Sequence, residues 1–159
     1  MLDSIRHKIL DKSSLKTWLD ETKSRNQKIV FTNGCFDILH RGHIEYLAKA
    51  AELGDVLIIG LNSDSSVKLL KGPGRPIQDE QSRALILASL QFVSKVILFE
   101  EETPYNLIKE VQPDVLVKGG DYKPAEIVGY DILQETGGQV ITVDFVKGYS
   151  SSSIIQLLK

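Results

Sequence analysis

Two histidines with a glycine between them carry the strongest chemical signal in the sequence. His40, Gly42 and His43 follow a short β-rich run, Lys28–Thr32, which breaks at an Asn-Gly pair. An apolar pattern with helical spacing begins directly after them. The histidines are therefore predicted to lie where a strand passes into the N-terminus of a helix. Unpaired main-chain N–H groups and the helix dipole favour an anion there, and the simplest such ligand is a phosphate.

Two other interpretations of the histidine pair remain open at this point. Two histidines can ligate a metal, or they can serve core packing alone. Their spacing is three residues and no Cys or Glu follows at a spacing typical of zinc sites, so we favour phosphate and assign no metal ligands. Gly42 fits this choice, because glycine lets a ligand approach the main chain closely. Cys35 lies in the same stretch, but no group is visible that would orient a base beside it, so we assign it no covalent role.

Three further loops hold residues suited to anions. The loop 71–76 contains two glycines, two prolines and two cations, although a solvated loop is the simpler interpretation of these charges. The run 118–122 is either an ordinary glycine turn or one wall of a pocket. The four serines 150–153 exceed what one helix cap needs and would provide hydroxyl and N–H groups for a second anion.

The elements that would position these loops alternate along the chain. Apolar runs predict strands, and amphipathic segments between them predict helices, which indicates an open, doubly wound α/β sheet that is mostly parallel. Ligands of such sheets bind beyond the carboxyl ends of the strands, and four loops of interest follow strands: 33–43, 62–64, 118–122 and 147–153. We therefore expect them to converge at one edge. The five predicted strands are 29–32, 55–61, 96–99, 115–117 and 140–143.

Residues 1–26 look helical and amphipathic, with Ser13 or Ser14 as the cap of a second helix. We expect this segment to be an N-terminal helical extension that packs on the core or on a partner subunit, and residues 27–159 to form the main domain. Apolar residues predicted on one face of the first helix are Ile5, Ile9 and Leu10.

The bulk composition bounds the class of protein. A chain of 159 residues corresponds to one domain, and its net charge of −2 argues against general nucleic-acid binding. The single cysteine excludes an intramolecular disulfide and fits a reducing compartment. The start of the chain lacks the apolar core of a signal peptide, and no run approaches the ~20 apolar residues of a membrane span. We expect a cytoplasmic protein with no nucleic-acid or membrane partner.

The segment Phe31–His43, FTNGCFDILHRGH, resembles the signature of the nucleotidyltransferases with a His-x-Gly-His motif. That superfamily includes the cytidylyltransferases, phosphopantetheine adenylyltransferase and the class I aminoacyl-tRNA synthetases. The residues of this segment most resemble the motif of the bacterial heptose 1-phosphate adenylyltransferases. Their activity occurs alone or as the C-terminal half of a bifunctional protein with a sugar kinase. The resemblance covers residues 28–159 and implies a Rossmann-like nucleotidyltransferase domain.

The resemblance implies an activity. The phosphate of heptose 1-phosphate would attack the α-phosphorus of ATP, releasing pyrophosphate and giving ADP-heptose for a surface glycolipid, with no covalent enzyme intermediate. Mg²⁺ would be carried with ATP, and the protein would be a homodimer, as relatives often are. The alternatives are a CTP-dependent cytidylyltransferase acting on an alcohol phosphate such as glycerol 3-phosphate, and a nucleotide-sensing module without turnover.

The resemblance also implies site residues. One lysine of the 71–76 loop, with Lys68 as second choice, and the arginine of a Gln-x-Arg pattern would contact the triphosphate. The family's pattern at the last turn is Ile-Ser-Ser/Thr-Thr-Lys-Ile, and this chain has Tyr149 and Ser153 where the pattern has its first isoleucine and its lysine, so Lys147 would have to supply any cation. The implied catalytic residues are His40, His43, Lys71 and Arg83. The implied nucleotide-binding residues are Asn33, Gly34, Cys35, Phe36, Gly42, His43, Lys118, Gly119, Asp121, Tyr122, Ser150, Ser151 and Ser152. The implied acceptor-binding residues are Asp37, Lys71 and Gly120, and Asp37 could also help to hold Mg²⁺.

Overall fold

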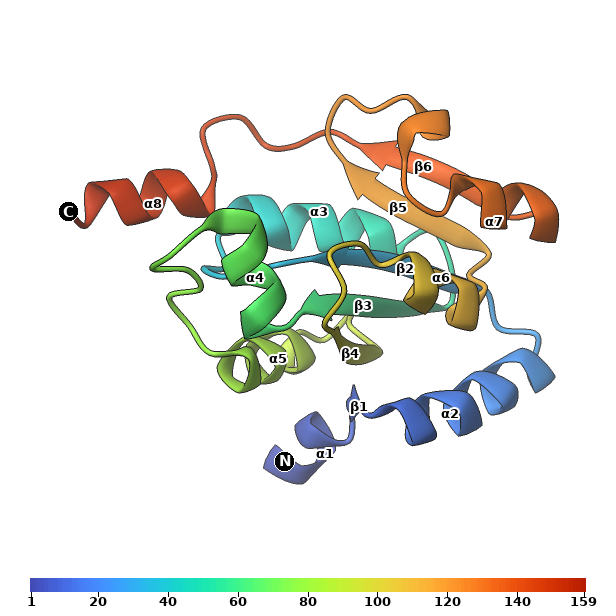
Figure 1. Ribbon diagram of the computed structural model, residues 1–159. Coiled ribbons are helices and arrows are strands. Elements are labelled where there is room, and N and C mark those ends of the chain that lie inside the picture. Colours follow the sequence, from blue (N-terminus) through green and yellow to red (C-terminus); the bar gives the residue numbers. More distant parts are fainter.

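The computed structural model describes all residues, 1–159, as a twisted parallel sheet with helices on both faces (Figure 1). The strands are β1 (Ile9–Leu10), β2 (Ile29–Gly34), β3 (Val56–Asn62), β4 (Lys95–Phe99), β5 (Val115–Gly119) and β6 (Gln139–Val143). The helices are α1 (Leu2–Arg6), α2 (Lys12–Ser24), α3 (Arg41–Ala51), α4 (Asp64–Lys71), α5 (Glu80–Ser89), α6 (Tyr105–Val111), the 3₁₀ turn η1 (Pro124–Glu126), α7 (Tyr130–Thr136) and α8 (Ser151–Leu157).

The strand order is β1-β4-β3-β2-β5-β6, and every neighbouring pair is parallel. From β2 the chain moves outward in one direction through β3 and β4, then returns to place β5 on the other side of β2. The order of the strands therefore reverses between β2 and β5. This confirms the predicted doubly wound sheet, and it marks the position where such sheets bind their ligands.

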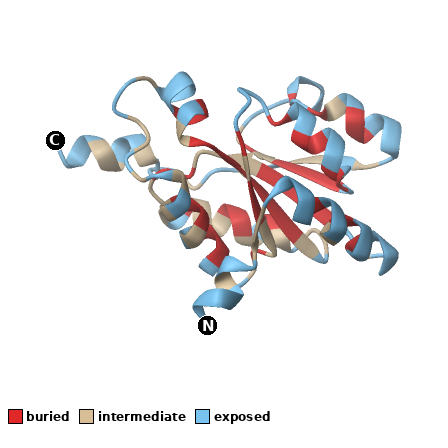
Figure 2. Ribbon diagram, turned by 60° about the horizontal axis from the view of Figure 1, so that its bottom comes forward, coloured by how far each residue is buried: buried red, intermediate tan, exposed pale blue.

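The core lies in two layers, one on each face of the sheet. On β2, Val30 contributes to the layer under α3 and α5, whereas Ile29 and Phe31 contribute to the layer under α2, α6 and α7. The three residues are fully buried. Figure 2 shows the buried strands between helices whose outer faces are exposed. Burial of both faces explains the continuous apolar runs of the central strands.

The N-terminal segment differs from the prediction. Ile9 and Leu10 form β1, which pairs with Val96 and Ile97 of β4 and raises the strand count from five to six. The cap of α2 is Asp11, whose carboxylate accepts from the N–H of Ser14 (2.8 Å). A two-residue strand is too short to show a periodicity of its own, so its pairing partner on β4 decides its conformation.

The helix predicted over 124–135 is divided in the structure. Pro124–Glu126 makes a single 3₁₀ turn, and α7 begins only at Tyr130 after Gly129, whose φ is +93°. All of the helices are too short or too polar to cross a lipid bilayer.

Candidate functional site

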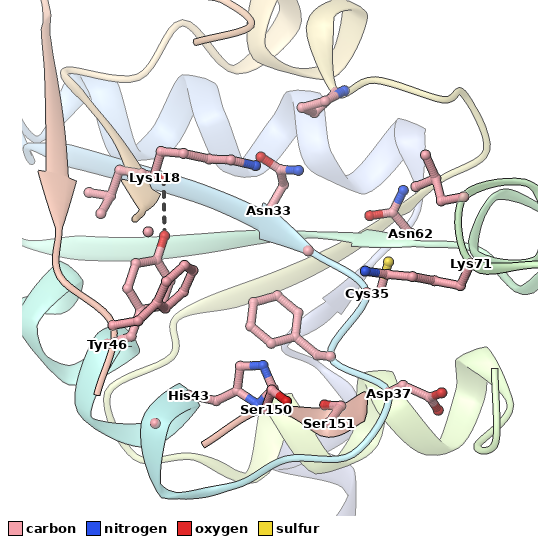
Figure 3. Close-up of a pocket in the computed structure, with 18 of the residues that line it drawn as sticks. Asn33, Cys35, Asp37, His43, Tyr46, Asn62, Lys71, Lys118, Ser150 and Ser151 are labelled. Carbon is pink, nitrogen blue, oxygen red and sulfur yellow. Dashed lines mark hydrogen bonds between the residues drawn. The ribbon is translucent and has the colours of Figure 1, made fainter. Parts of the chain in front are cut away.

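A cavity of about 770 Å³ opens at the carboxyl ends of β2 and β5, where the strand order reverses. Its wall is formed by the turn between β2 and α3, the loops after β3, β4, β5 and β6, and the N-terminus of α8 (Figure 3). The volume suits a small-molecule ligand. The loops that were expected to converge from the sequence do meet at this one edge.

His40 and His43 lie against each other at the N-terminal end of α3. Their ring centroids are 3.8 Å apart with an interplanar angle of 24°, and the edge of Phe36 packs on His43 with 5.2 Å between centroids. Both rings border the cavity, yet Nδ1 of each ring is buried with no hydrogen-bond partner. Because buried polar atoms in proteins are normally paired, this arrangement favours a ligand-binding role over core packing alone.

Burial holds the pKa of both histidines below its ordinary value. For His43, burial and the neighbouring His40 lower the pKa from 6.5 to about 4. Burial also lowers the pKa of His40. At neutral pH both rings are therefore uncharged, and each carries one N–H donor and one acceptor.

The first turn of α3 adds main-chain donors to this region. The N–H of His43 bonds to the carbonyl of His40 (3.0 Å), whereas the N–H groups of Arg41 and Gly42 have no acceptor within the protein. His40 occupies the N-cap position, and its side chain makes no capping bond. The positive end of the helix dipole thus remains available to an anion in the cavity.

Gly42 is required for packing as well as for access. A Cβ at this position would lie 2.9 Å from Cε1 of His40 and 3.3 Å from Cβ of Tyr149. The ring of Tyr149 stacks on that of His40, with centroids 6.3 Å apart. Glycine therefore allows the His40 ring to fold back over the first turn of α3, a role that the sequence did not reveal.

Three cations border the cavity: Lys71, Arg75 and Lys118. Figure 3 shows Lys71 beside Cys35 and Lys118 beside Asn33, so positive charge reaches the cavity from both sides of β2. Lys118 is half-buried, and burial lowers its pKa. Desolvated cations attract anions more strongly than exposed ones, which suits a polyphosphate.

Asp37 borders the cavity, but its carboxylate is already occupied. It accepts from Arg75 Nε (2.7 Å), from the N–H of Ile77 (2.8 Å) and from the N–H of Gln78 (3.0 Å). Burial alone would raise the pKa of Asp37, but the main-chain donors and Arg75 outweigh it and lower the pKa. This side chain anchors the end of the 71–76 loop, and the expected contact with the acceptor or with Mg²⁺ stays a prediction.

Arg83 also differs from the expectation. It is 1% exposed and lies outside the cavity wall. Its guanidinium donates to the carbonyls of Cys35 (2.7 Å), Asn62 (2.8 Å) and Gln78 (3.0 Å) and pairs with Asp64 at 2.8 Å. These bonds join the ends of β2 and β3, which indicates that Arg83 positions the site. Its expected contact with the triphosphate stays a prediction.

The loop after β5 and the serine turn meet the cavity in part. Gly119 and Tyr122 border it, whereas Gly120 and Asp121, also expected there, lie outside its wall. The serines 150–152 all border it. Ser150 caps α8, and Ser151 donates to the carbonyl of Ile38 (2.8 Å). Among the three serine hydroxyls, that of Ser152 alone has no partner within the protein. The other predicted nucleotide-binding residues on the cavity wall are Asn33, Gly34, Cys35, Phe36, Gly42, His43 and Lys118.

Several residues of the cavity wall were not predicted. Tyr46 shares a 2.5 Å hydrogen bond with Thr32 and donates to the carbonyl of Val117 (3.2 Å), which joins α3 to β2 and β5 at the base of the cavity. The apolar positions expected in that helix, Ile44, Leu47, Ala48 and Ala51, did not include Tyr46, so the sequence pattern gave no signal for it. Asn62 lies in a loop, 62–64, that was expected at this edge but was given no role. Other wall residues that the sequence did not mark are Thr103, Pro104, Ile127, Val128, Phe145 and Val146.

Comparison with known proteins agrees with this geometry. Residues 31–157 match the cytidylyltransferase-like family model. The chain is 59% identical over 135 residues to the bifunctional protein HldE of a Nitratiruptor species, which covers 85% of this chain and 28% of that protein. It is 51% identical over 156 residues to the bifunctional protein HldE of Campylobacter concisus, which covers 98% of this chain and 32% of that protein. The chain therefore spans about a third of the length of these relatives.

The fold is also similar to that of a solved structure. The lipopolysaccharide core biosynthesis protein from Thermoplasma volcanium superposes with a TM-score of 0.62 at 33% identity, covering 78% of this chain and 99% of that one. The chain belongs to the cytidylyltransferase-like family, and its His-x-Gly-His motif borders the cavity.

Proposed function

We propose that the protein transfers AMP from ATP to a heptose 1-phosphate, releasing pyrophosphate and giving ADP-heptose for lipopolysaccharide core or surface glycan synthesis. One observation carries the proposal: the stacked, neutral pair His40 and His43 borders a cavity at the reversal point of the sheet, with cations on both sides. The resemblance of the motif to heptose 1-phosphate adenylyltransferases supports the substrates, and the similarity to the lipopolysaccharide core biosynthesis protein from Thermoplasma volcanium agrees with them.

The proposed reaction is a single in-line displacement. An oxygen of the acceptor phosphate forms a new bond to the α-phosphorus of ATP, while the bond from that phosphorus to the α–β bridging oxygen breaks and its electron pair leaves with pyrophosphate. A phosphate dianion needs no base to become a nucleophile. Catalysis then consists of positioning and of donors aimed at the charge that develops on the phosphates, which the two imidazoles, the first turn of α3, Lys71 and Lys118 supply.

Mg²⁺ enters this proposal as part of the substrate, bound to ATP. The carboxylate of Asp37 accepts from three N–H donors, so the proposal does not require it as a metal ligand. Phosphate oxygens and water would complete the coordination shell, which is the usual arrangement for Mg²⁺ with nucleotides.

Pyrophosphate release across a matrix of nucleotides and acceptors tests the proposal. We expect turnover with ATP and heptose 1-phosphate. With CTP or with glycerol 3-phosphate, kcat/KM should be lower by at least about 10-fold, which corresponds to about 1.4 kcal/mol of transition-state binding free energy. Turnover only with CTP and a polyol phosphate would replace the proposal by the cytidylyltransferase alternative. ATP binding in calorimetry with no pyrophosphate from any acceptor would instead favour a nucleotide-sensing module.

The homodimer and the cytoplasmic location expected from the sequence remain predictions. Sedimentation velocity at micromolar concentration measures the first, with a single species at the mass of one chain as the contrary result. Cell fractionation measures the second.

A further inference from the structure

Asn62 is a buried polar residue at the end of β3 whose side chain has no partner in the protein. It is 3% exposed and borders the cavity. The main-chain carbonyl of Asn62 accepts from Arg83 Nη1 (2.8 Å), but its side-chain amide takes part in none of the hydrogen bonds of the protein. The only fully enclosed side-chain polar atoms without a partner are Nδ1 of His40 and Nδ1 of His43, so the amide atoms of Asn62 are not fully enclosed. The amide of Asn62 therefore opens onto the cavity.

The position of Asn62 in the sheet separates it from the nucleotide side. The order β4-β3-β2-β5-β6 places β3 on one side of the β2 motif and β5 on the other. Tyr122 and Phe145, which follow β5 and β6, give the cavity an aromatic wall suited to a base. Asn62 lies on the opposite side, and Figure 3 shows it near Lys71 and Cys35. Thr103, in the loop after β4, borders the cavity on that same side.

The chemistry of the side chain suits a hydroxylated ligand. An amide carries one acceptor oxygen and two N–H donors, and a sugar hydroxyl is likewise both donor and acceptor. A phosphate would use only the donors and leave the buried oxygen unpaired, and Lys71 already supplies a charge for phosphate on this side. The main-chain carbonyl of Asn62 is bonded to Arg83, which holds the residue at the cavity edge and leaves its side-chain amide available to a matching ligand.

We propose that Asn62 binds hydroxyl groups of the acceptor sugar and determines selectivity for it. This inference rests on the proposed function and deepens it by assigning the acceptor pocket to the ends of β3 and β4. A site built to hydrogen-bond a substrate hydroxyl rejects analogues that lack it, because its own polar group is then left buried without a partner.

The variant Asn62→Ala tests the assignment by steady-state kinetics. We expect the KM for heptose 1-phosphate to rise by about 10-fold, the scale of one buried hydrogen bond, while the KM for ATP stays within about twofold. Because the amide makes no internal bond, the thermal midpoint should not fall. A series of monodeoxy acceptors then locates the contact: the analogue that loses the bonded hydroxyl should be discriminated by the native protein and no longer by Asn62→Ala.

Asn106→Ala is the matched control, because Asn106 is exposed on α6 and does not border the cavity. It should leave both KM values unchanged. If the native protein turns over heptose 1-phosphate and Asn62→Ala keeps the same acceptor KM, the assignment of Asn62 is wrong while the proposed function stands. A rise in the KM for ATP alone would show that Asn62 contacts the nucleotide and would overturn its assignment to the acceptor. No turnover of the native protein with any heptose 1-phosphate would overturn both proposals.

Discussion

The paired imidazoles of His40 and His43 act in the proposed reaction as uncharged donors. Two protonated rings at a centroid separation of 3.8 Å would repel each other, and burial already disfavours charge on each of them. The uncharged pair can therefore donate hydrogen bonds without binding a counter-ion that a substrate would first have to displace.

Replacing one imidazole should lower turnover sharply. For His43→Ala we expect kcat to fall by about 100-fold or more, since removing one preorganised transition-state donor costs about 3 kcal/mol. His7→Ala is the control, because His7 is exposed near the N-terminus and away from the cavity. A folded His43→Ala protein with native turnover would contradict the assignment of this residue.

The titration of His43 should respond to the ligand. Its pKa of about 4 lies below the ordinary 6.5, so ¹H–¹³C NMR of the imidazole should show no protonation above about pH 5. Mg·ATP or pyrophosphate should raise this pKa, because an anion favours the charged ring.

The sign of the associated stability change follows from linkage. The unfolded chain binds a proton at His43 near pH 6.5 and the folded protein only near pH 4. The contribution of this residue to stability is therefore complete above pH 6.5 and lost as the pH falls toward 4. In urea titrations the pH dependence across this window should be weaker in His43→Gln. An equal slope in both proteins would exclude the depressed pKa.

At the scale of elements, Arg83 of α5 joins the ends of two neighbouring strands. The carbonyls it bonds belong to the residue directly after β2 and to the last residue of β3. This contact fixes the start of the motif loop relative to the end of β3, where we propose that the acceptor binds. The sequence indicated an important arginine but could not reveal its bond to the main chain of Cys35, because Cys35 is 48 positions away along the chain. The same reason hid the contacts of Asp37 with the 75–78 segment.

Arg83→Leu should therefore lose stability as well as activity. We expect the free energy of unfolding to fall by about 3 kcal/mol, because buried carbonyls are left without donors. The urea midpoint measures this, with Arg25→Leu, an exposed position after α2, as the control. An unchanged midpoint combined with lost ATP affinity would instead restore a direct contact between Arg83 and the triphosphate.

At the scale of the whole molecule, the periodicity of apolar residues in the sequence predicted the central strands. It did not predict structure that depends on pairing between distant segments, such as β1. The central strands were found because both of their faces are buried, so that Ile29, Val30 and Phe31 run continuously apolar. β1 was missed because its two residues become a strand only by pairing with β4. The position of the cavity followed from the alternation of strands and helices, but the internal partners of its polar side chains depend on contacts between distant segments.

The N-terminal segment is part of the same fold, because α2 covers one face of the sheet. Leu15 is fully buried in the layer with Ile29, Phe31 and Ile58. Leu15→Ala should lower the free energy of unfolding by about 3 kcal/mol through the cavity it leaves, with kcat unchanged at temperatures where the protein is folded. Leu2→Ala, at a residue that is 47% exposed, is the control. Native stability of Leu15→Ala would show that the segment is dispensable.

The central position of β2 has a consequence for the evolution of this domain. β3 and β4 lie on one side of β2, and β5 and β6 on the other. Under the proposed assignments, the loops after β5 and β6 would select the base and those after β3 and β4 the acceptor. A descendant could then change one substrate by replacing a single pair of loops and keep the other substrate. Loop grafts between members that differ in only one substrate should transfer that preference alone.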